Sequence, residues 1–598
     1  MDSRARRSYF YLKPARPQGV QPMKNQEIAK IFAEIAEYLE MEGVPFKPYA
    51  YQKAALTLDT LKEDVAEIYL SRGLKGLKAI PGVGESMALK IEEFLTTGKM
   101  AYYEEFKRKM PVELDELIRV EGMGPKKAKV LYEKLGVKNL QELEDAARAH
   151  KIAPLFGFGD KTEQNLLEAI EFLKRSHGRF LLGEVLPLAQ EVMEKLIQLK
   201  EVERLDMAGS LRRMKDTIGD VDFLVISQNP APVMDFFVSL PGVVKVWGHG
   251  ATKSSVRLKE GLDMDLRVIP PESYGSALQY FTGSKDHNIA LRKIALDQGL
   301  KLSEYGLFRG SQRVAGATEE EVYQALGLAW IPPEMREDRG EIEAARAGTL
   351  PRIIEAGEVK GDLHVHCNWN GGANSIEELA AAALGMGYEY LGIADHTKFL
   401  KIEHGLDEEQ LAARNREIDG LNARLAREGR KFRVLKGCEA NIMADGTIDI
   451  ADEVLAELDF VIAGVHSQFK MSRAEMTARV VKAMRNPHVD IISHPTGRIL
   501  KRRDEFEIDF ETILQVAQET GTVLEINSYP ERLDLNDVNI LRAKQAGVKM
   551  VINTDAHNIE QLHLIKFGVA QARRGWAEGR EIINTWPVAE LLGLLAHP

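Results

Sequence analysis

Hydrophobic and polar positions follow three successive patterns along this chain of 598 residues. From about residue 26 apolar side chains recur at helical spacing, as at Ile28, Ile31 and Ile35. In the middle of the chain, residues 223–226 form a continuous apolar and β-prone run that predicts a buried strand. Beyond residue 358, short apolar runs alternate with helical stretches. These patterns predict a multidomain protein with a helical N-terminal region, an α/β centre and a C-terminal β/α barrel.

The composition is that of a soluble globular protein, with 44% hydrophobic and 28% charged residues. We expect no membrane association, because no apolar run approaches the roughly 18 residues that a membrane span requires. The first ten residues lack the apolar core of a secretory signal. The two cysteines, Cys367 and Cys438, cannot form a disulfide framework. A cytoplasmic location is therefore expected.

The charge is unevenly distributed along the chain. The net charge is −11, but residues 1–180 hold 30 Lys and Arg against 27 Asp and Glu, whereas residues 341–598 hold 30 against 40. Because much of the acidity lies at the C-terminal end, we expect any phosphate backbone to contact the N-terminal half. The charge alone would not predict DNA binding.

Three short glycine hairpins recur in the N-terminal half, each between helical segments. Their glycines are Gly82 and Gly84, Gly122 and Gly124, and Gly157 and Gly159. In a helix-hairpin-helix, glycines let the backbone approach a phosphate and the next helix offers its N-terminal amides. One Gly-x-Gly is also an ordinary turn, but three favour DNA binding. Lys126, Lys127 and Lys129 follow the second hairpin and add sequence-independent attraction to phosphates.

Three aspartates in the central region follow a Gly209-Ser210 turn. Asp220 and Asp222 precede a predicted strand, and Asp265 lies in a second predicted strand. Residues two apart on a strand point to the same side, so Asp220 and Asp222 face one site. Carboxylates on adjacent strands can hold two divalent ions, as in-line phosphoryl transfer requires. The alternative, a pair of solvated strand ends, does not account for the Gly-Ser turn and the third aspartate.

Together with residues 280–284 and the helical residues after them, these motifs resemble the family X DNA polymerases over about residues 25–335. The resemblance implies that the three aspartates hold two Mg²⁺ or Mn²⁺ ions. It implies nucleotide binding by Ser210, Arg213, Gly219, Tyr280, Phe281, Asn288 and Arg292. Tyr280 and Phe281 would border the sugar, although aromatic residues taken singly are more often part of a core.

Two positions in this half depart from the family pattern. Asp263 stands where a basic or neutral residue is common, and a fourth carboxylate there would raise the pKa of its neighbours, unless it turns to solvent. Lys90 matches the position of a lyase lysine that forms a Schiff base, with Lys47 and Tyr51 as supporting residues. Ser86, however, replaces a further lysine. Lys90 is therefore either a lyase residue or a phosphate-facing lysine.

Possible metal ligands follow the apolar runs of the C-terminal half. They are His364, His366, His396, Glu439, His466, His494, Asp555 and His557. Ligands at the carboxyl ends of successive strands are expected of a β/α barrel site, and imidazoles with a bridging carboxylate suit Zn²⁺, Mn²⁺ or Fe²⁺. This half resembles the polymerase-and-histidinol-phosphatase (PHP) domain. The resemblance implies a distorted seven-stranded barrel, two or three Zn²⁺ or Mn²⁺ ions, and 3′→5′ exonuclease activity, sometimes with abasic-site cleavage.

The first PHP motif is incomplete in this chain. The family continues from its His-x-His to an aspartate that supplies a ninth ligand, and Gly371 replaces this aspartate here. The resemblance then implies that the third ion binds more weakly, or relies on water or Asn370. We expect an exonuclease that is impaired or more dependent on added Mn²⁺.

These patterns divide the chain into seven segments. They are a flexible basic tail (1–22), a helix-hairpin-helix domain (23–105), a helical DNA-binding subdomain (106–180), a nucleotidyltransferase palm (181–270), a nucleotide-selection subdomain (271–335), a linker (336–358) and a (β/α)7 PHP barrel (359–598).

The expected function is a bacterial, monomeric repair polymerase that fills gapped or primer-template DNA from dNTPs and trims 3′ ends. Two alternatives concern the barrel, which could instead be a small-molecule phosphatase or a structural partner of the polymerase half. Template-independent nucleotidyl transfer on the same palm is a further possibility, although Arg292 and the hairpins favour a template.

Overall fold

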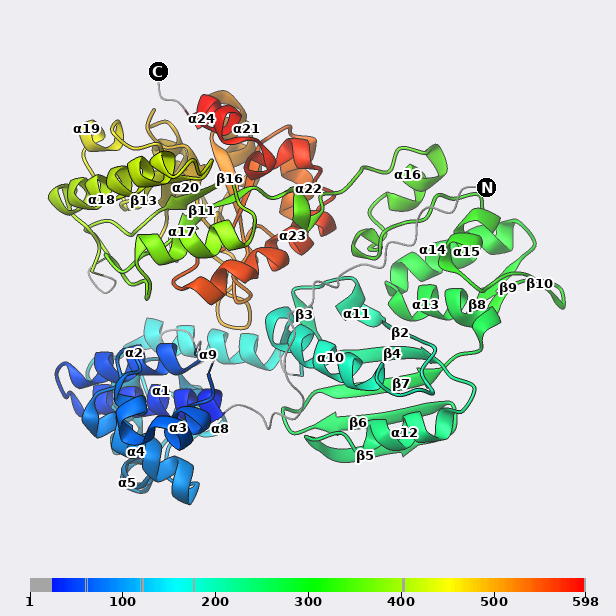
Figure 1. Ribbon diagram of the computed structural model, residues 1–598, viewed down its shortest axis with the longest axis horizontal. Coiled ribbons are helices and arrows are strands. Elements are labelled where there is room, and N and C mark those ends of the chain that lie inside the picture. Colours follow the sequence, from blue (N-terminus) through cyan, green and yellow to red (C-terminus); the bar gives the residue numbers. More distant parts are fainter. Residues whose placement is uncertain are drawn as a thin grey trace. The chain divides into compact units, whose positions relative to one another are not determined.

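The computed structural model describes residues 24–595 except 60, 62, 119, 121–122, 176–177 and 401–403. The expected tail, residues 1–22, therefore lies outside the described residues. The chain forms two compact units that divide between Lys174 and Arg175 (Figure 1). No helix in the described residues is long and apolar enough to cross a membrane.

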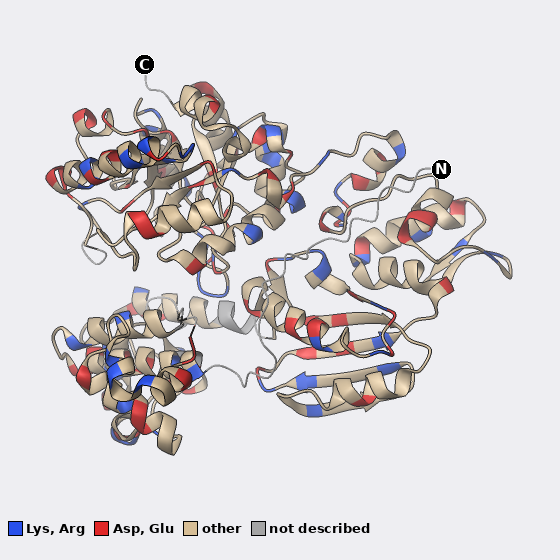
Figure 2. Cartoon of the chain, viewed as in Figure 1, with Lys and Arg blue, Asp and Glu red and all other residues tan. Residues whose placement is uncertain are grey.

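The described residues of the N-terminal unit form helices joined by short loops and contain no strand. Its helices are α1 (Lys24–Glu42), α2 (Lys47–Asp59), α3 (Val65–Lys78), α4 (Glu85–Thr97), α5 (Ala101–Lys109), α6 (Leu114–Leu117), α7 (Pro125–Leu135), α8 (Leu140–Arg148) and α9 (Asp160–Arg175). Apolar residues of α1, such as Ile28, Phe32 and Ile35, are fully buried in its core. Lys and Arg lie among Asp and Glu over these helices (Figure 2).

The glycine hairpins lead directly into helices, as the sequence predicts. Gly84 caps α4 and Gly124 caps α7, where Pro125 occupies the first turn. Gly82 has φ of +79° and Gly157 has φ of +85°, a backbone conformation that only glycine adopts without strain. Gly159 precedes α9. Gly122 lies outside the described residues.

The first part of the second unit is built on a mixed five-stranded sheet. Its strands are β2 (Arg204–Met207), β4 (Asp220–Ile226), β5 (Val243–His249), β6 (Lys253–Leu258) and β7 (Asp263–Val268), in the order β2-β4-β7-β6-β5. The pair β4–β7 is parallel and the other three pairs are antiparallel. The accompanying elements are α10 (Leu182–Leu196), α11 (Gly209–Arg212), α12 (Pro230–Val238), β1 (Phe180–Leu181) and β3 (Thr217–Ile218).

A small helical region follows this sheet. It contains α13 (Tyr274–Thr282), α14 (Lys285–Asp297), α15 (Glu319–Ala325), α16 (Glu341–Ala347) and the hairpin strands β8 (Lys301–Ser303), β9 (Gly306–Arg309) and β10 (Gln312–Ala315). Helix α16 falls within the segment that the sequence assigned to a linker. Its Ile342 and Ala345 are buried in the core of this region. At least one charge of this segment is paired within the fold, because the buried Arg336 binds Glu319 at 2.6 Å.

The C-terminal region is a barrel of seven parallel strands in sequential order. The strands are β11 (Gly361–Val365), β12 (Tyr390–Ile393), β13 (Arg433–Asn441), β14 (Phe460–Gly464), β15 (Ile491–Ile492), β16 (Val523–Asn527) and β17 (Met550–Asn553). A parallel bridge between Val365 and Ala556 brings the first strand to the end of the last. The predicted distorted (β/α)7 barrel is therefore confirmed.

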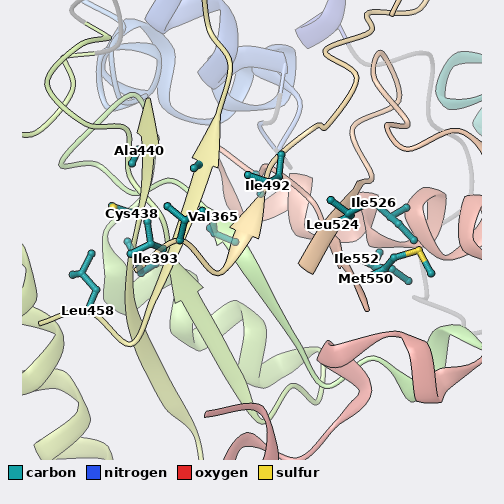
Figure 3. Close-up of a cluster of buried hydrophobic side chains, with 14 of the residues drawn as sticks. Val365, Ile393, Cys438, Ala440, Leu458, Ile492, Leu524, Ile526, Met550 and Ile552 are labelled. Carbon is teal, nitrogen blue, oxygen red and sulfur yellow. The ribbon is translucent and has the colours of Figure 1, made fainter. Parts of the chain in front are cut away.

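Helices surround the barrel (Figure 1). They are α17 (Ile376–Gly385), α18 (Glu408–Arg427), α19 (Asp452–Leu455), α20 (Arg473–Met484), α21 (Phe510–Thr520), α22 (Asp537–Gln545), α23 (Ile565–Arg574) and α24 (Val588–Leu595). Strand residues such as Val365, Ile393 and Cys438 pack with Ile526 and Ile552 in one buried cluster (Figure 3). This apolar packing holds the strand ends that carry the polar site.

Candidate active sites

The three central aspartates meet at the β4–β7 pair. The register places Asp220 opposite Asp263 and Asp222 opposite Asp265. The turn at Gly209 closes over them, because a Cβ atom at Gly209 would lie 3.1 Å from Asp222 Oδ2, and its φ is +65°. A cavity of about 590 Å³ opens on this site, lined by Gly219, Asp220, Trp247, Ser255, Asp263 and Asp265.

These carboxylates are electrostatically suited to a cation. Burial, reinforced by the charges of Asp220 and Asp265, raises the pKa of Asp222 to about 6. Burial and Asp265 likewise raise the pKa of Asp220. Lys253 Nζ lies 2.7 Å from Asp265, and Arg267 lies 3.3 Å from the same carboxylate. Divalent ions at this site would relieve the repulsion between carboxylates that these two cations only partly offset.

The Asp263 side chain is partly exposed, at 41%, and is bound by two other side chains. Arg257 donates hydrogen bonds of 2.8 and 2.7 Å to its two oxygens, and Trp247 Nε1 donates one of 3.0 Å. The Arg257 hydrogen bond holds the pKa of Asp263 below its usual value. Asp263 still adds to the raised pKa of Asp220. The sequence left two alternatives for Asp263, a carboxylate that raises the pKa of its neighbours or one turned to solvent. Asp263 combines the two, because it is partly exposed and ion-paired but still raises the pKa of Asp220.

The aromatic residues expected at the sugar lie at the end of α13. The Tyr280 and Phe281 rings are 5.2 Å apart and nearly perpendicular, and the Arg267 guanidinium lies 4.5 Å from the Phe281 ring. Arg267 therefore connects Phe281 to the aspartates. Asn288 donates a hydrogen bond of 2.7 Å to the Tyr280 carbonyl oxygen. Arg292 donates to the Asn288 carbonyl oxygen, one turn along α14.

The three remaining nucleotide-binding candidates lie in the segment that leads into β4. Ser210 is in the short helix α11, and Gly219 directly precedes β4. The Arg213 guanidinium is largely buried and donates to Glu337 at 3.0 Å and to the Thr282 carbonyl oxygen. Burial lowers the pKa of Arg213.

Sequence reasoning missed Trp247, Arg257, Lys253 and Arg267 at this site. One of them carried a usable signal, because Arg267 is two residues from Asp265 on the same strand and must face the same side.

The eight predicted ligands of the barrel converge on one buried cluster. Glu439, at the end of β13, lies at its centre. Its Oε2 atom is 2.7 Å from His396 and 3.3 Å from His364, and its Oε1 atom is 3.1 Å from both His466 and His494. The two oxygens of Glu439 thus face different histidine pairs, as a bridging ligand would.

The remaining ligands complete the cluster on the other side. His366 Nε2 lies 3.2 Å from Asp555 Oδ1, and the His366 and His557 rings are 4.3 Å apart. Three groups have ligand atoms close enough to share an ion: His366, His396 and His557; His364, His366 and Asp555; and His396, Glu439 and His466.

The donor atoms of this cluster fit divalent ions. Within the described residues, buried side-chain atoms without a hydrogen-bond partner include His364 Nε2, His366 Nδ1 and Nε2, His396 Nδ1, His494 Nδ1 and Glu439 Oε2. Unpaired buried polar atoms are costly, and a metal would satisfy them. Burial, with the neighbouring His557 and His396, lowers the pKa of His366 far below its usual value, which leaves it neutral and able to bind a metal.

Surrounding polar residues orient these ligands. Glu525, on β16, accepts from His364 Nδ1 at 2.7 Å and from the His494 backbone amide at 2.8 Å. Asn441 Oδ1 lies 2.7 Å from His466 Nδ1. The Asn370 side-chain oxygen accepts from the His396 backbone amide at 3.2 Å. Gly371 has φ of +60°.

Lys90, the possible lyase residue, lies on α4 in the N-terminal unit. Its Nζ donates to Ser86 Oγ at 2.7 Å and lies 4.6 Å from the Tyr102 ring. Burial, with the positive charge of Lys47, lowers the pKa of Lys90. Tyr51 is buried and its pKa is raised.

Four protein families match successive parts of the chain. A helix-hairpin-helix domain matches residues 23–100 and a SAM-like helix-hairpin-helix tandem matches 114–171. The DNA polymerase beta thumb matches 277–337 and the PHP domain matches 362–529.

The hairpins, the three-aspartate sheet and the histidine barrel define a family X DNA polymerase with a PHP domain. The DNA polymerase/3′-5′ exonuclease PolX of Bacillus subtilis is 39% identical over 567 residues, covering 94% of this chain and 97% of the relative. The chain belongs to this PolX family.

Two further relatives match parts of the chain. DNA polymerase lambda of Arabidopsis thaliana is 26% identical over 53% of this chain and 62% of its own length. A probable phosphatase of Thermoanaerobacter is 32% identical over 33% of this chain and 78% of its own length.

Proposed function

We propose that this chain is a DNA polymerase that fills short gaps during repair, and that its barrel is a metal-dependent 3′→5′ exonuclease. The observation that supports polymerisation most strongly is the β4–β7 register, which brings Asp222 opposite Asp265. The gathering of six histidines and two carboxylates supports hydrolysis. The name of the Bacillus subtilis relative combines the same two activities.

In the palm, Asp220, Asp222 and Asp265 would hold two Mg²⁺ or Mn²⁺ ions. Such ions activate the primer 3′-hydroxyl and neutralise charge on the triphosphate. Lys253 and Arg267 fix the position of the Asp265 carboxylate. Ser210, Arg213 and Gly219 would bind the triphosphate.

Selection of the nucleotide is assigned to the α13–α14 junction. Tyr280 and Phe281 would border the sugar, and Asn288 would contact the minor-groove edge of the incoming base. The hydrogen bond from Asn288 to the Tyr280 carbonyl oxygen would keep these two contacts in a fixed relationship. Arg292 would face the template.

In the barrel, the eight ligands would hold two or three Zn²⁺ or Mn²⁺ ions. Such ions supply a hydroxide nucleophile and stabilise charge on the phosphodiester. Glu439 would bridge them, because its two oxygens face separate histidine pairs. The ion near His396 and His557 lacks a carboxylate at position 371, so hydrolysis is expected to depend more strongly on added Mn²⁺.

The proposed role of the N-terminal unit is to bind DNA. The proposed substrates of the protein are gapped or primer-template DNA and dNTPs. The amides at the starts of α4 and α7, behind Gly84 and Gly124, suit phosphate oxygens. Lys126 and Lys127 lie in the first turn of α7. The proposed form is a cytoplasmic monomer, and the two buried free thiols agree with a reducing compartment.

A gapped, 3′-labelled duplex tests the two main assignments. The wild type, Asp220→Ala and His466→Ala are each assayed with Mg²⁺ or Mn²⁺. Asp220→Ala should lose primer extension and retain mononucleotide release, and His466→Ala should do the reverse. Loss of both activities in either variant would contradict two separate sites. Release of phosphate from small phosphomonoesters without DNA cleavage would favour the phosphatase alternative, and full metal occupancy without any hydrolysis would favour a structural barrel.

A 5′-deoxyribose-phosphate lyase is a second candidate activity, supported by the lowered pKa of Lys90. A Schiff base requires a neutral amine, which burial and the neighbouring Lys47 favour. Borohydride should trap the wild type and Lys99→Ala on a 5′-deoxyribose-phosphate end, but not Lys90→Ala. Equal trapping of all three proteins would assign Lys90 to phosphate binding alone.

A further inference from the structure

A buried ion-pair network joins the barrel to the nucleotide-binding loop of the palm. Its central residue is Arg574, the last residue of α23, which is 2% exposed. The Arg574 Nη1 atom donates to the Arg213 carbonyl oxygen at 2.7 Å and to Glu337 Oε1 at 3.1 Å. The same Glu337 oxygen accepts from Arg213 Nε at 3.0 Å. Arg574 therefore holds Arg213 by its backbone and, through Glu337, by its side chain.

Arg574 is itself fixed from the barrel side. Its Nη2 atom donates to Asp537, at the start of α22, and the two nearby acidic residues raise the pKa of Arg574 against its burial. Asp537 also pairs with Arg339 at 3.0 Å. Because an arginine holds several acceptors in one plane, the network has a defined geometry that a point charge would not supply.

The other side of Arg213 faces the turn between α13 and α14. Its Nη1 atom donates to the Thr282 carbonyl oxygen, and a Cβ atom on Gly283 would approach this nitrogen to 2.9 Å. Ser284 in the same turn caps α14, which carries Asn288 and Arg292. The Arg213 guanidinium thus lies between Glu337 and the nucleotide-selection segment.

From this geometry we propose that Arg574 of the barrel is a positioning residue for nucleotide binding in the palm. The inference rests on the proposed role of Arg213 in binding the triphosphate. Without Arg574, the Arg213 carbonyl loses this donor, and Glu337 keeps its ion pairs with Arg213 and with Lys215, the latter 3.8 Å away. The Arg213 guanidinium would then pair more strongly with Glu337. It would adopt the orientation that binds a triphosphate less often.

The test separates positioning from simple loosening of the junction. Arg573, the preceding residue, also joins the barrel to the polymerase half: it donates to Glu334 at 2.8 Å and to the Ile354 carbonyl oxygen. Neither of these two hydrogen bonds involves Arg213. Arg573→Gln is therefore the matched control for Arg574→Gln. Asp537→Asn removes the charge that pairs with Arg574 from the barrel side. It leaves the hydrogen bonds of Arg574 to Arg213 and Glu337 possible.

Steady-state dNTP incorporation on gapped DNA should show the effect in KM. We expect Arg574→Gln to raise the KM for dNTP about 10-fold, because misplacing a positioning group by about 1 Å can cost up to roughly 100-fold. The kcat and the exonuclease rate of the same preparation should change by less than about 3-fold. Arg574→Lys and Asp537→Asn should give smaller increases in KM, and Arg573→Gln should leave KM near the wild-type value.

A purely structural role would lower the melting temperature and reduce both activities without changing KM. An equal rise in KM for Arg573→Gln and Arg574→Gln would overturn the proposal. If Arg574→Gln does not fold, the KM values of Asp537→Asn and Arg574→Lys provide the test. An unchanged KM for dNTP in both variants would overturn the proposal. Arg213→Ala is measured in parallel. If Arg213→Ala leaves the KM for dNTP unchanged, the proposed role of Arg213 in binding the triphosphate is wrong. If Arg213→Ala raises KM but the Arg574 and Asp537 variants do not, the positioning role of Arg574 is wrong.

Discussion

The two carboxylate oxygens of Asp263 are bound by the guanidinium of Arg257, at 2.8 and 2.7 Å. This pair lies on adjacent antiparallel strands, β6 and β7, where the two residues are directly opposite. It offsets part of the charge of a fourth carboxylate, which still contributes to the raised pKa of Asp220. The palm can therefore tolerate an acidic residue at a position next to its metal-binding aspartates.

Arg257→Ala should shift the acid side of the polymerisation pH profile to higher pH. Once unpaired, Asp263 raises the pKa of Asp220 further, so a higher pH is needed to ionise the triad. Asp263→Asn should shift the profile the other way, and the double variant should resemble Asp263→Asn. The measurement is kcat/KM for dNTP from pH 5 to 9, with Lys259→Ala as the control on the same hairpin. Superimposable profiles for all variants would show that the pair has no influence on the triad.

Glu525→Gln should weaken metal binding in the barrel. Glu525 holds the ring of His364 and the backbone of His494, and loss of such a partner typically costs about 10–100-fold in metal affinity. The concentration of Mn²⁺ that gives half-maximal exonuclease activity should rise by this factor, with polymerisation unchanged. Glu531→Gln, which removes a nearby carboxylate that pairs with Arg502, is the control. An unchanged Mn²⁺ requirement would leave Glu525 with only a folding role.

Gly371→Asp should strengthen the third metal site and increase the exonuclease rate at low Mn²⁺. The side chain would supply the carboxylate that the PHP motif lacks near His396 and His557. Because position 371 has φ of +60°, the substitution should cost about 1 kcal/mol of stability in the metal-free protein. Metal content by mass spectrometry and the exonuclease rate are compared with those of Gly371→Ala, which has the backbone cost alone. If the aspartate variant matches the alanine variant in both, Gly371 does not limit the site.

Asp534→Asn should remove a pH dependence of barrel stability. Burial raises the pKa of Asp534 to about 6, above its unfolded value of about 3.8. The folded protein therefore retains a proton that the unfolded chain releases, so this group lowers stability as pH rises from about 4 to 6. Between pH 4 and 7 the variant should gain roughly 1–3 kcal/mol relative to the wild type. The free energy of unfolding is measured by urea denaturation at pH 4 and pH 7, with Asp504→Asn, at an exposed position, as the control. A difference between Asp534→Asn and the wild type that is the same at both pH values would contradict the prediction.

Much of both sites could be predicted because their residues carry local signals. The aspartates of β4 and the histidines of the barrel lie at fixed positions relative to apolar strands, and strand geometry determines which way they face. The charged segment after Pro333 gave a misleading local signal, since a run of charges resembles a solvated linker. In the folded chain Arg336 is fully buried against Glu319, and Glu341 is fully buried against His287.

Contacts between distant parts of the chain could not be predicted in this way. Arg574 and Arg213 are 361 residues apart, and no spacing or periodicity connects them. The same holds for Trp247 and Asp263, whose hydrogen bond depends on how three strands are ordered in the sheet. Such contacts follow from topology and side-chain packing, and a single sequence specifies neither explicitly.

The apolar residues of β7 protect the alignment of the metal-binding aspartates. A shift of β7 by one position would place Met264 or Leu266, both fully buried, opposite Asp222 in the place of Asp265. Such a shift would turn every buried side chain of β7 out of the core, so the register is strongly specified. We therefore expect an extra residue in the turn before β7, residues 259–262, to be accommodated by the turn itself, and the length of this turn is free to vary without loss of synthesis.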